Sequence, residues 1–313
     1  MHPLTIIFQH SFYEAAFPSI WKDAIVIPLY KGRGSHDSTT AYRPISLCHC
    51  LDKILEKIVH KQLCNYLSDN QLLHPAQHGF TQRLSTTTNL LVFDAHITKI
   101  ISVGHAYDII SVDFQKAFDK APHDLVIKAA AKLGIADKAL GWLASFLAGR
   151  KQRVRVGESI SQFSEVSSGV IQGSALGPDL YTIFIDELLR LIKHPAVGFA
   201  DDLKFLADVT EEPVTTVQAD INTIAEWAKA HRSPISIEKC GVLHCGTKQP
   251  NHVYIIDGKP LNVLDSFVDQ ELSGEDSILI TNHVQECTKC TAHADLIRTL
   301  KDSVARGCPP VEA

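Results

Sequence analysis

Apolar residues along the chain recur with two different spacings. Segments in which they recur every three or four residues predict amphipathic helices, at residues 4–12, 51–67, 90–101 and 217–230. Shorter, nearly continuous apolar segments predict strands, at residues 21–30, 108–114, 196–198 and 203–207. Basic and apolar residues alternate over a further predicted strand, 151–156, and more helices are expected at 121–133, 138–147 and 181–192. The pattern therefore predicts a mixed α and β protein.

The segment 51–67 shows the clearest helical pattern. Its predicted apolar face consists of Leu51, Ile54, Leu55, Ile58, Val59, Leu63 and Leu67. Lys53, Lys57 and Lys61 fall on the other side, which we interpret as a solvated face. Before the next helix, the polar run 85–88 offers a side chain that can cap the helix N-terminus.

Two adjacent carboxylates, Asp201 and Asp202, interrupt the apolar pair of strands at 196–207. The pattern predicts a tight turn between antiparallel strands, with both acidic side chains at the turn. The apolar flanks cannot neutralise two charges side by side, whereas a divalent metal ion with oxygen ligands can. A third carboxylate, Asp113, lies inside the apolar strand predicted at 108–114 and is the expected partner.

The bulk properties place few limits on the chemistry. Of 313 residues, 45% are hydrophobic and 21% charged, and the net charge of −5 argues against a basic surface over the whole protein. No apolar run approaches the roughly 20 residues that span a bilayer, and the N-terminus lacks the features of a signal peptide. The eight cysteines are scattered, so we expect reduced thiols in an intracellular protein, in the nucleus or the cytoplasm, neither secreted nor membrane-bound.

Carboxylates that enter from separate parts of the chain suit a site for phosphoryl transfer with two metal ions. Two such ions can stabilise both the attacking and the leaving oxygen, and Mg²⁺ accepts substrate phosphates in its coordination shell. Cationic side chains must then contact a triphosphate. Lys31 in a glycine-bearing loop and Arg43 beside a proline are the candidates in the N-terminal part.

Seven stretches in a fixed order resemble the reverse transcriptase domain of non-LTR (LINE-type) retrotransposons, most closely those of the jockey and chicken-repeat groups. They read FPSIWKDAIVIPLYKGRG, YRPISLCHCLDKILEKIVHKQL, QHGFTQRLSTTTNLL, SVDFQKAFDKAPHDLVIKAAAKLGI, SSGVIQGSALGPDLYTIFIDEL, GFADDLKFLADV and EKCGVLHCG. All seven fall within residues 12–246, and seven ordered matches are far more specific than one short motif. Ser233-Pro234-Ile235-Ser236-Ile237 departs from the family's pattern before the last stretch, and beyond residue 247 the resemblance is faint.

The resemblance implies a role for each matching residue. Asp113, Asp201 and Asp202 would be catalytic and would bind metal together with the Phe114 carbonyl. Lys239 would lie near the leaving pyrophosphate as a general acid. The implied nucleotide-binding residues are Lys31, Arg43, Phe118, Gln172 and Gly173, where Phe118 would reject a ribose 2′-hydroxyl. Asp119 has the simpler interpretation of a cap for the following helix.

The resemblance also implies an α+β right-hand polymerase with an antiparallel palm sheet backed by helices. Fingers are expected at 1–107, palm at 108–255 and a partial or degenerate thumb at 256–313. The implied function is RNA-directed DNA polymerisation with two Mg²⁺ ions, an RNA template, a DNA primer and deoxynucleoside triphosphates. The parent element would also carry an endonuclease domain, which this chain lacks, so we expect a fragment.

Two other functions fit parts of the sequence. One is a catalytically inactive fragment that at most binds nucleic acid, which the acidic net charge and the divergent tail favour. The other is an unrelated Mg²⁺-dependent hydrolase with the same carboxylates, which leaves Phe118 and Gln172 unexplained.

Two further segments have alternative interpretations. Lys151, Arg153 and Arg155 fit either contacts with backbone phosphate or a solvated edge strand. For Cys287-Thr288-Lys289-Cys290, we predict a helix rather than a zinc site, because a fourth ligand is not evident.

Overall fold

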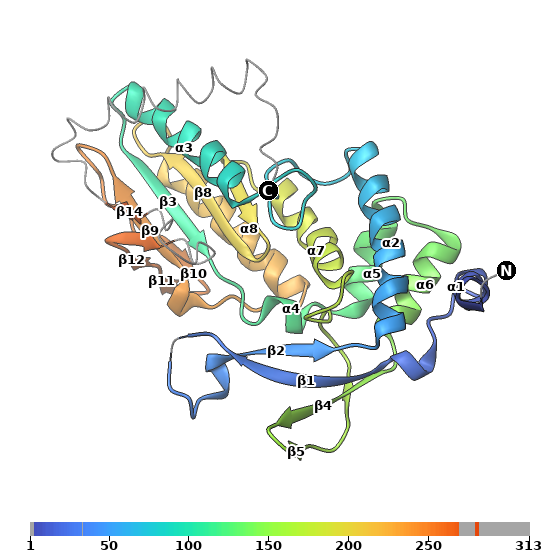
Figure 1. The fold of residues 1–313 in the computed structure, drawn as a ribbon. Coiled ribbons are helices and arrows are strands. Elements are labelled where there is room, and N and C mark those ends of the chain that lie inside the picture. Colours follow the sequence, from blue (N-terminus) through green and yellow to red (C-terminus); the bar gives the residue numbers. More distant parts are fainter. Residues whose placement is uncertain (1–2, 33, 269–278, 282–313) are drawn as a thin grey trace, which may run out of the picture.

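Two separate β-sheets organise the fold, which a computed structural model describes for residues 3–32, 34–268 and 279–281 (Figure 1). The first sheet has the order β2-β1-β4-β5, with β6 paired to β4, and the second has the order β12-β9-β3-β8-β7. The strands of the first sheet are β1 (Asp23–Tyr30), β2 (Tyr42–Leu47), β4 (Arg150–Val156), β5 (Ser159–Ile160) and β6 (Ser164–Val166). Those of the second are β3 (Tyr107–Val112), β7 (Ala196–Phe199), β8 (Asp202–Asp208), β9 (Gly241–Cys245) and β12 (Asn262–Val263).

Eight α-helices in the described residues surround these sheets and confirm the helices predicted from apolar spacing. They are α1 (Pro3–Tyr13), α2 (Cys50–Asp69), α3 (Thr86–Ser102), α4 (Ala117–Lys120), α5 (His123–Lys132), α6 (Asp137–Leu147), α7 (Gly177–Leu191) and α8 (Val214–Ala230). The helix α7 begins four residues before the predicted start, since Pro178 is tolerated in a first turn and the Ser174 hydroxyl accepts the Gly177 N–H at 2.8 Å. Ser85 caps α3 in a capping box with Thr88, as expected.

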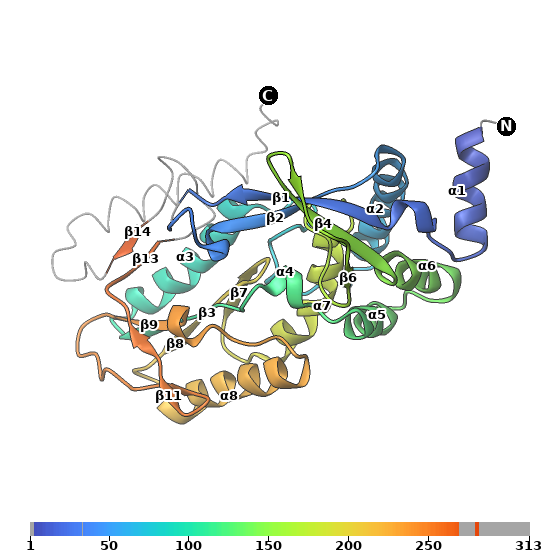
Figure 2. The same ribbon diagram turned by 90° about the horizontal axis from the view of Figure 1, so that it is seen from below.

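The second sheet is buried on both faces, which explains the nearly continuous apolar sequence of its central strand β3. On one face Ile109 packs in a cluster with Phe93 and Ile97 of α3. On the other face Ile110 joins the main core, which α7 and α8 contribute to. Figure 2 shows α3 and α8 on opposite sides of this sheet. Successive residues of a strand point to opposite faces, so both must be apolar here.

The apolar face predicted for α2 is wrong in part. Leu55, Val59, Leu63 and Leu67 are buried, but Leu51, Ile54 and Ile58 are 36–48% exposed. Asp52 and Glu56 are fully buried in their place. The reason is that the Glu56 carboxylate accepts the backbone N–H groups of Ala175 (2.7 Å) and Leu176 (3.2 Å), which hold the segment before α7. Burial and the neighbouring Glu56 raise the pKa of Asp52 to about 8.

The strand β4 is not at an edge of its sheet, contrary to the solvated-edge interpretation of its basic residues. It pairs in parallel with β1, in the register Asp23↔Lys151, and antiparallel with β5 and β6. The guanidinium of Arg153 lies 4.8 Å from the centre of the Phe163 ring. β4 therefore lies inside the same sheet as the N-terminal strands β1 and β2.

The last described residues form short strands. They are β10 (Ile255–Ile256), β11 (Lys259–Pro260), β13 (Ser266–Val268) and β14 (Leu279–Thr281). The helix predicted around Cys287–Cys290 lies outside the described residues. Among the helices that the structure describes, each is too short or too polar to cross a bilayer.

Candidate active site

The three predicted carboxylates meet at one end of the second sheet. β3 and β8 are antiparallel with Val112 opposite Leu203, so that Asp113 follows at the position opposite Asp202. β7 and β8 are joined by the two-residue turn Ala200–Asp201, closed by the pair Phe199↔Asp202. The register therefore confirms the prediction that Asp113 and the Asp pair converge.

A buried glutamine, Gln77, holds the backbone of the turn. Its side-chain oxygen accepts the Ala200 N–H at 3.1 Å, and its side-chain nitrogen donates to the Ala200 carbonyl at 3.2 Å. Ala200 has a φ of 57°, which a residue with a side chain adopts only when neighbouring contacts enforce it. Gln77 is 1% exposed, so both hydrogen bonds are shielded from water. The backbone of Ala200, just before Asp201, is thus held by Gln77, which lies outside the hairpin of β7 and β8.

The segment around Gln77 also fits the turn closely. A Cβ atom on Gly79 would lie 2.2 Å from the Ala200 nitrogen, so only glycine fits at this position. The His78 N–H donates to the Gly198 carbonyl at 2.8 Å, and the Asn89 side chain donates to the same carbonyl at 3.1 Å. From the sequence, residues 77–80 are expected to form a turn, with no further role. Its signal was the glutamine and glycine flanked by apolar sequence, but nothing local shows which hairpin they contact.

The electrostatics of the site disfavour three free carboxylates. Burial raises the pKa of Asp201 to about 6, and the charges of Asp202 and Asp113 add to this effect, whereas Lys239 opposes it. The Lys239 ammonium lies 3.3 Å from one Asp113 oxygen and 3.4 Å from the other. Behind the carboxylates, burial and the same three acids raise the pKa of the Tyr181 hydroxyl well above its usual value. Negative charge therefore accumulates at this end of β3 and β8.

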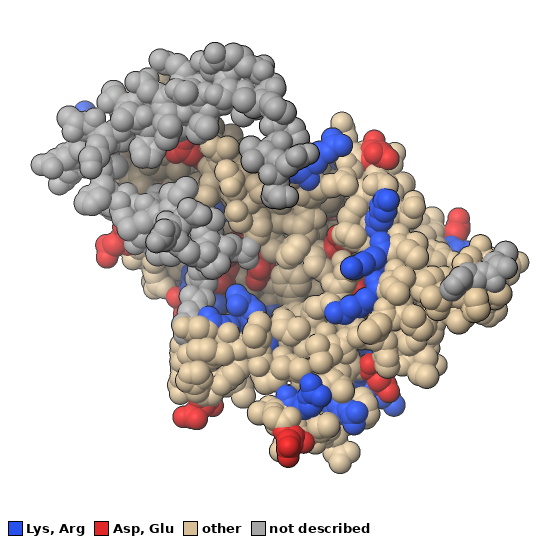
Figure 3. All heavy atoms as spheres, in the orientation of Figure 1, with Lys and Arg blue, Asp and Glu red and all other residues tan. Residues whose placement is uncertain are grey.

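This donor set fits divalent metal ions. The three carboxyl groups supply oxygen ligands at the ends of two neighbouring strands, and burial with the nearby acids disfavours the ionised form of Asp201, which a bound cation would favour. Phe114 follows Asp113 and is buried, and its backbone forms a bridge with Ile235. In Figure 3 acidic side chains are visible in the floor of a hollow between the sheets and α2.

Phe118 packs against two aromatic side chains, Tyr181 and Phe80. Its ring stacks on Tyr181 with the centres 4.5 Å apart, and Phe80 contacts it edge-on at 6.0 Å. The side chain is half-buried. The contacts with Tyr181 and Phe80 hold the Phe118 ring in one orientation.

The loop before α7 brings Gln172 to Asp119. The Gln172 amide donates to the Asp119 carboxylate at 2.7 Å, so Asp119 orients this loop. The expectation that Asp119 caps the next helix is therefore wrong. The N-terminal position of α5 is instead occupied by Pro122. Burial raises the pKa of Asp119, with Gln172, Lys116 and Lys31 acting in the opposite direction. Lys31 is therefore close enough to Asp119 for a charge interaction, and it also donates to the Thr40 carbonyl at 2.9 Å.

Gly173 touches the first sheet. A Cβ on this residue would lie 2.8 Å from the Ser46 carbonyl oxygen, and its φ of 103° also requires glycine. The Ser46 N–H donates to the Gln172 carbonyl at 2.8 Å. Arg43 lies on the same strand, β2, with an exposed side chain, and pairs in register with Leu29. The structure thus joins the predicted nucleotide loop to the sheet that carries Arg43.

Fold and site together define a class, an α+β polymerase with carboxylates at the end of an antiparallel sheet. A sequence profile of the family described as reverse transcriptase (RNA-dependent DNA polymerase) matches residues 31–281. The chain belongs to this reverse transcriptase family.

Curated relatives come from non-LTR retrotransposons, as the sequence motifs indicated. The chain is 31% identical over 236 residues to a probable RNA-directed DNA polymerase from transposon BS of Drosophila melanogaster, covering 72% of this chain and 26% of that protein. It is 28% identical over 252 residues to the RNA-directed DNA polymerase from mobile element jockey of the same fly, covering 76% of this chain and 27% of that protein. The chain thus spans about a quarter of the length of these relatives.

Solved structures support the fold. Apo telomerase from Candida tropicalis, truncated from its C-terminal domain, superposes with a TM-score of 0.55 at 12% identity, over 83% of this chain and 57% of that chain. Telomerase from the same yeast in complex with a fragment of telomeric RNA gives a TM-score of 0.54 at 10% identity, over 87% of this chain and 48% of that chain. The α+β polymerase fold predicted from the sequence is therefore confirmed.

Proposed function

We propose that this chain is the catalytic part of an RNA-directed DNA polymerase from a non-LTR retrotransposon. It adds deoxynucleotides to a DNA 3′-hydroxyl and copies an RNA template. The observation that carries the proposal is the position of Asp113 opposite Asp202 across β3 and β8, with Asp201 in the adjoining turn. Family membership and the polymerase fold support the same reaction.

The carboxylates of Asp113, Asp201 and Asp202 and the carbonyl of Phe114 would hold two Mg²⁺ ions. When bound, the ions lower the pKa of the attacking hydroxyl and stabilise charge on the transferring phosphoryl group. The protein itself positions the reacting groups. Gln77 keeps Ala200 in its left-handed conformation, and so fixes the direction in which the next residue, Asp201, leaves the turn.

The remaining predicted residues would bind the nucleotide. Phe118, stacked on Tyr181, would lie under the sugar and exclude a 2′-hydroxyl. Gln172 and Gly173 would contact the nascent base pair, held by Asp119 and Ser46.

Three cations would bind phosphate groups. The exposed side chains of Lys31 and Arg43 come from the first sheet and its loop and would bind the triphosphate. The Lys239 ammonium, 61% exposed, is free to turn from Asp113 toward a leaving pyrophosphate and donate a proton.

We assign the fingers to residues 1–107, the palm to 108–255 and a partial thumb to 256–313, as the order of motifs implies. The hollow visible in Figure 3 suits a template and primer, because basic side chains line up over α2 beside it. The lysines of this helix are Lys53, Lys57 and Lys61. Phosphate contacts of this kind bind nucleic acid without reading its sequence.

Primer extension tests the proposal. The chain is incubated with a DNA primer on an RNA template, the four deoxynucleoside triphosphates and Mg²⁺, beside the variants Asp201→Ala and Asp37→Asn, the latter an exposed acid far along the sequence. We expect extension by the wild type and by Asp37→Asn and none by Asp201→Ala. Duplex binding without extension above the Asp201→Ala background would instead identify an inactive nucleic-acid-binding fragment. Phosphate release that does not depend on the template would identify a hydrolase.

A further inference from the structure

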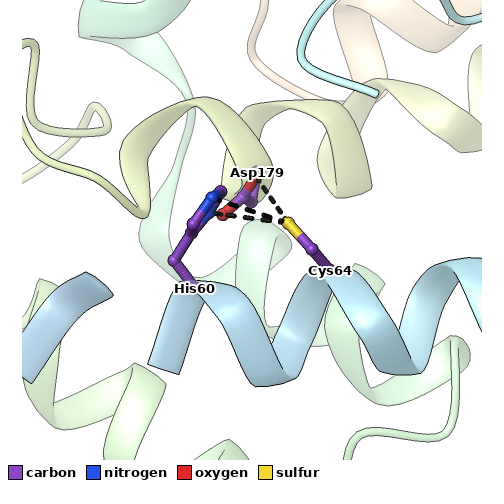
Figure 4. A group of neighbouring side chains, drawn as sticks. All are labelled: His60, Cys64 and Asp179. Carbon is purple, nitrogen blue, oxygen red and sulfur yellow. Dashed lines mark hydrogen bonds and ion pairs between the residues drawn. The ribbon is translucent and has the colours of Figure 1, made fainter. Parts of the chain in front are cut away.

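Outside the carboxylate site, three side chains of different kinds converge between two helices. His60 and Cys64 are four residues apart on α2 and so lie on one face of that helix. Asp179 faces them from the first turn of α7 (Figure 4). The Cys64 sulfur lies 3.5 Å from His60 Nδ1 and 3.6 Å from Asp179 Oδ1. His60 Nδ1 lies 2.5 Å from Asp179 Oδ2.

These separations resemble the edges of a tetrahedral coordination shell. Bonds of about 2.3 Å to sulfur and about 2.0–2.2 Å to nitrogen and oxygen place tetrahedral ligands about 3.3–3.6 Å apart. Both separations from the Cys64 sulfur already match. His60 Nδ1 lies 2.5 Å from the other oxygen of the Asp179 carboxylate, Oδ2, so this hydrogen bond would have to give way when both groups bind the ion. The His60 side chain is 41% exposed, so its ring has room to move while Asp179 stays fixed in its helix.

The surroundings leave space for a fourth ligand. A cavity of about 370 Å³ lies beside the cluster, and Cys64, Asp179, Leu67, Phe80 and Thr182 are among the residues that line it. The Cys64 sulfur and the Asp179 carboxylate therefore border a space that is large enough for a water ligand. Three protein ligands with one open position are the usual arrangement of an accessible zinc site.

We propose that His60, Cys64 and Asp179 bind a thiophilic divalent cation of the zinc class. A thiolate and an imidazole select such ions over Mg²⁺ and Ca²⁺, which require oxygen ligands. The site joins α2 to the start of α7, directly after the segment that Glu56 holds. The ion thus stabilises the contact between the N-terminal part of the chain and the helix behind the carboxylates.

The simpler alternative is a hydrogen-bonded cluster in which the thiol and the imidazole both donate to Asp179. The thiol is not a reactive nucleophile in that state, because burial and Asp179 raise the pKa of Cys64 to about 12. A titration with Co²⁺ distinguishes the two cases. A cobalt thiolate gives a charge-transfer absorption band, and tetrahedral Co²⁺ gives intense visible bands, neither of which a hydrogen-bonded cluster produces.

The titration uses the full chain under reducing conditions with excess Mg²⁺. Cys50→Ser is the matched control, since Cys50 is an exposed thiol at the start of the same helix. A Cys287→Ser/Cys290→Ser variant removes a pair of thiols that are three residues apart in the sequence. We expect both controls and Asp201→Asn to keep the bands. Cys64→Ser should lose the thiolate band, and His60→Gln, at a half-exposed position that tolerates substitution, should bind Co²⁺ more weakly by at least about tenfold.

A second measurement uses Zn²⁺ alone. It should raise the melting temperature of the wild type and of Cys50→Ser, but not that of Cys64→Ser or His60→Gln, because binding to the folded state stabilises it. The proposal is overturned if the thiolate band survives in Cys64→Ser, disappears in the Cys287→Ser/Cys290→Ser variant, or is absent from the wild type. None of these results depends on polymerase activity, since Asp201→Asn keeps the proposed zinc-class site.

Discussion

Replacing Asp201 by asparagine should remove activity and at the same time stabilise the metal-free protein. Burial, assisted by Asp202 and Asp113, raises the pKa of Asp201 from 3.8 to about 6. The folded state therefore holds this proton more tightly than the unfolded chain does. The contribution of Asp201 to stability is highest below about pH 4, falls as the pH rises to about 6, and stays low above that. A pKa difference of about two corresponds to about 3 kcal/mol at 25 °C.

The assay is chemical or thermal denaturation in the presence of a chelator at pH 5 and pH 8. At pH 8 we expect Asp201→Asn to be more stable than the wild type by about 2–3 kcal/mol, or on the order of 5–10 °C in melting temperature. At pH 5 the difference should be smaller, since part of the population is already protonated. Adding Mg²⁺ should stabilise the wild type more than the variant. Asp37→Asn is the control and should change neither curve.

The reasoning would be refuted if Asp201→Asn were no more stable than the wild type at pH 8 without metal. That result would mean that protein cations already neutralise the three carboxylates. The stabilisation expected here has a general cause, because sites shaped for catalysis keep groups in environments that disfavour their charged forms.

Three further substitutions test how the site is held. Gln77→Leu leaves the N–H and carbonyl of Ala200 unpaired, so the rate of nucleotide addition should fall by about 10–100-fold while primer–template affinity, measured by titration, stays unchanged. Phe118→Ala opens space beside Tyr181, and the preference for deoxynucleotides over ribonucleotides in primer extension should fall by on the order of 10–100-fold. Glu56→Leu removes the acceptor for two backbone N–H groups and should cost about 3 kcal/mol in urea denaturation, whereas Glu56→Gln keeps an acceptor and should cost less.

Each of these has its own contradicting result. An equal loss of rate in Gln82→Leu, at an exposed glutamine nearby, would show that Gln77 does not act through the turn. Unchanged sugar preference in Phe118→Ala would remove that residue from substrate selection. Equal stability of Glu56→Leu and Glu56→Gln would mean that the hydrogen bonds of the Glu56 side chain do not stabilise the fold.

The parts of the fold that could be predicted from sequence are those with strong local signals. The apolar strand ending at Asp113 and the two apolar segments around Asp201 define their own strands, and antiparallel pairing then brings the acids together. The capping residue Ser85 and the periodicity of α8 are equally local. Such elements depend on spacing within a dozen residues, which the sequence shows directly.

What could not be predicted depends on contacts between distant segments. The apolar pattern of α2 favours burial of Ile54 and Ile58, but the loop before α7 needs the Glu56 carboxylate, and so the helix turns that side inward. Gln77 and Ala200 are 123 residues apart, and no periodicity relates them. In the same way Asp119 looked like a helix cap because its partner, Gln172, is 53 residues away.

The most direct test of the central claim is to count the metal ions that the carboxylates hold. Mn²⁺ is titrated into the protein with primer–template bound, and free Mn²⁺ is measured by electron paramagnetic resonance. Bound Mn²⁺ should be lost, or its affinity lowered by at least about tenfold, in both Asp113→Asn and Asp201→Asn, and should be unchanged in Asp37→Asn. Identical Mn²⁺ binding by all four proteins would contradict the account, because the two strands would then share no ion.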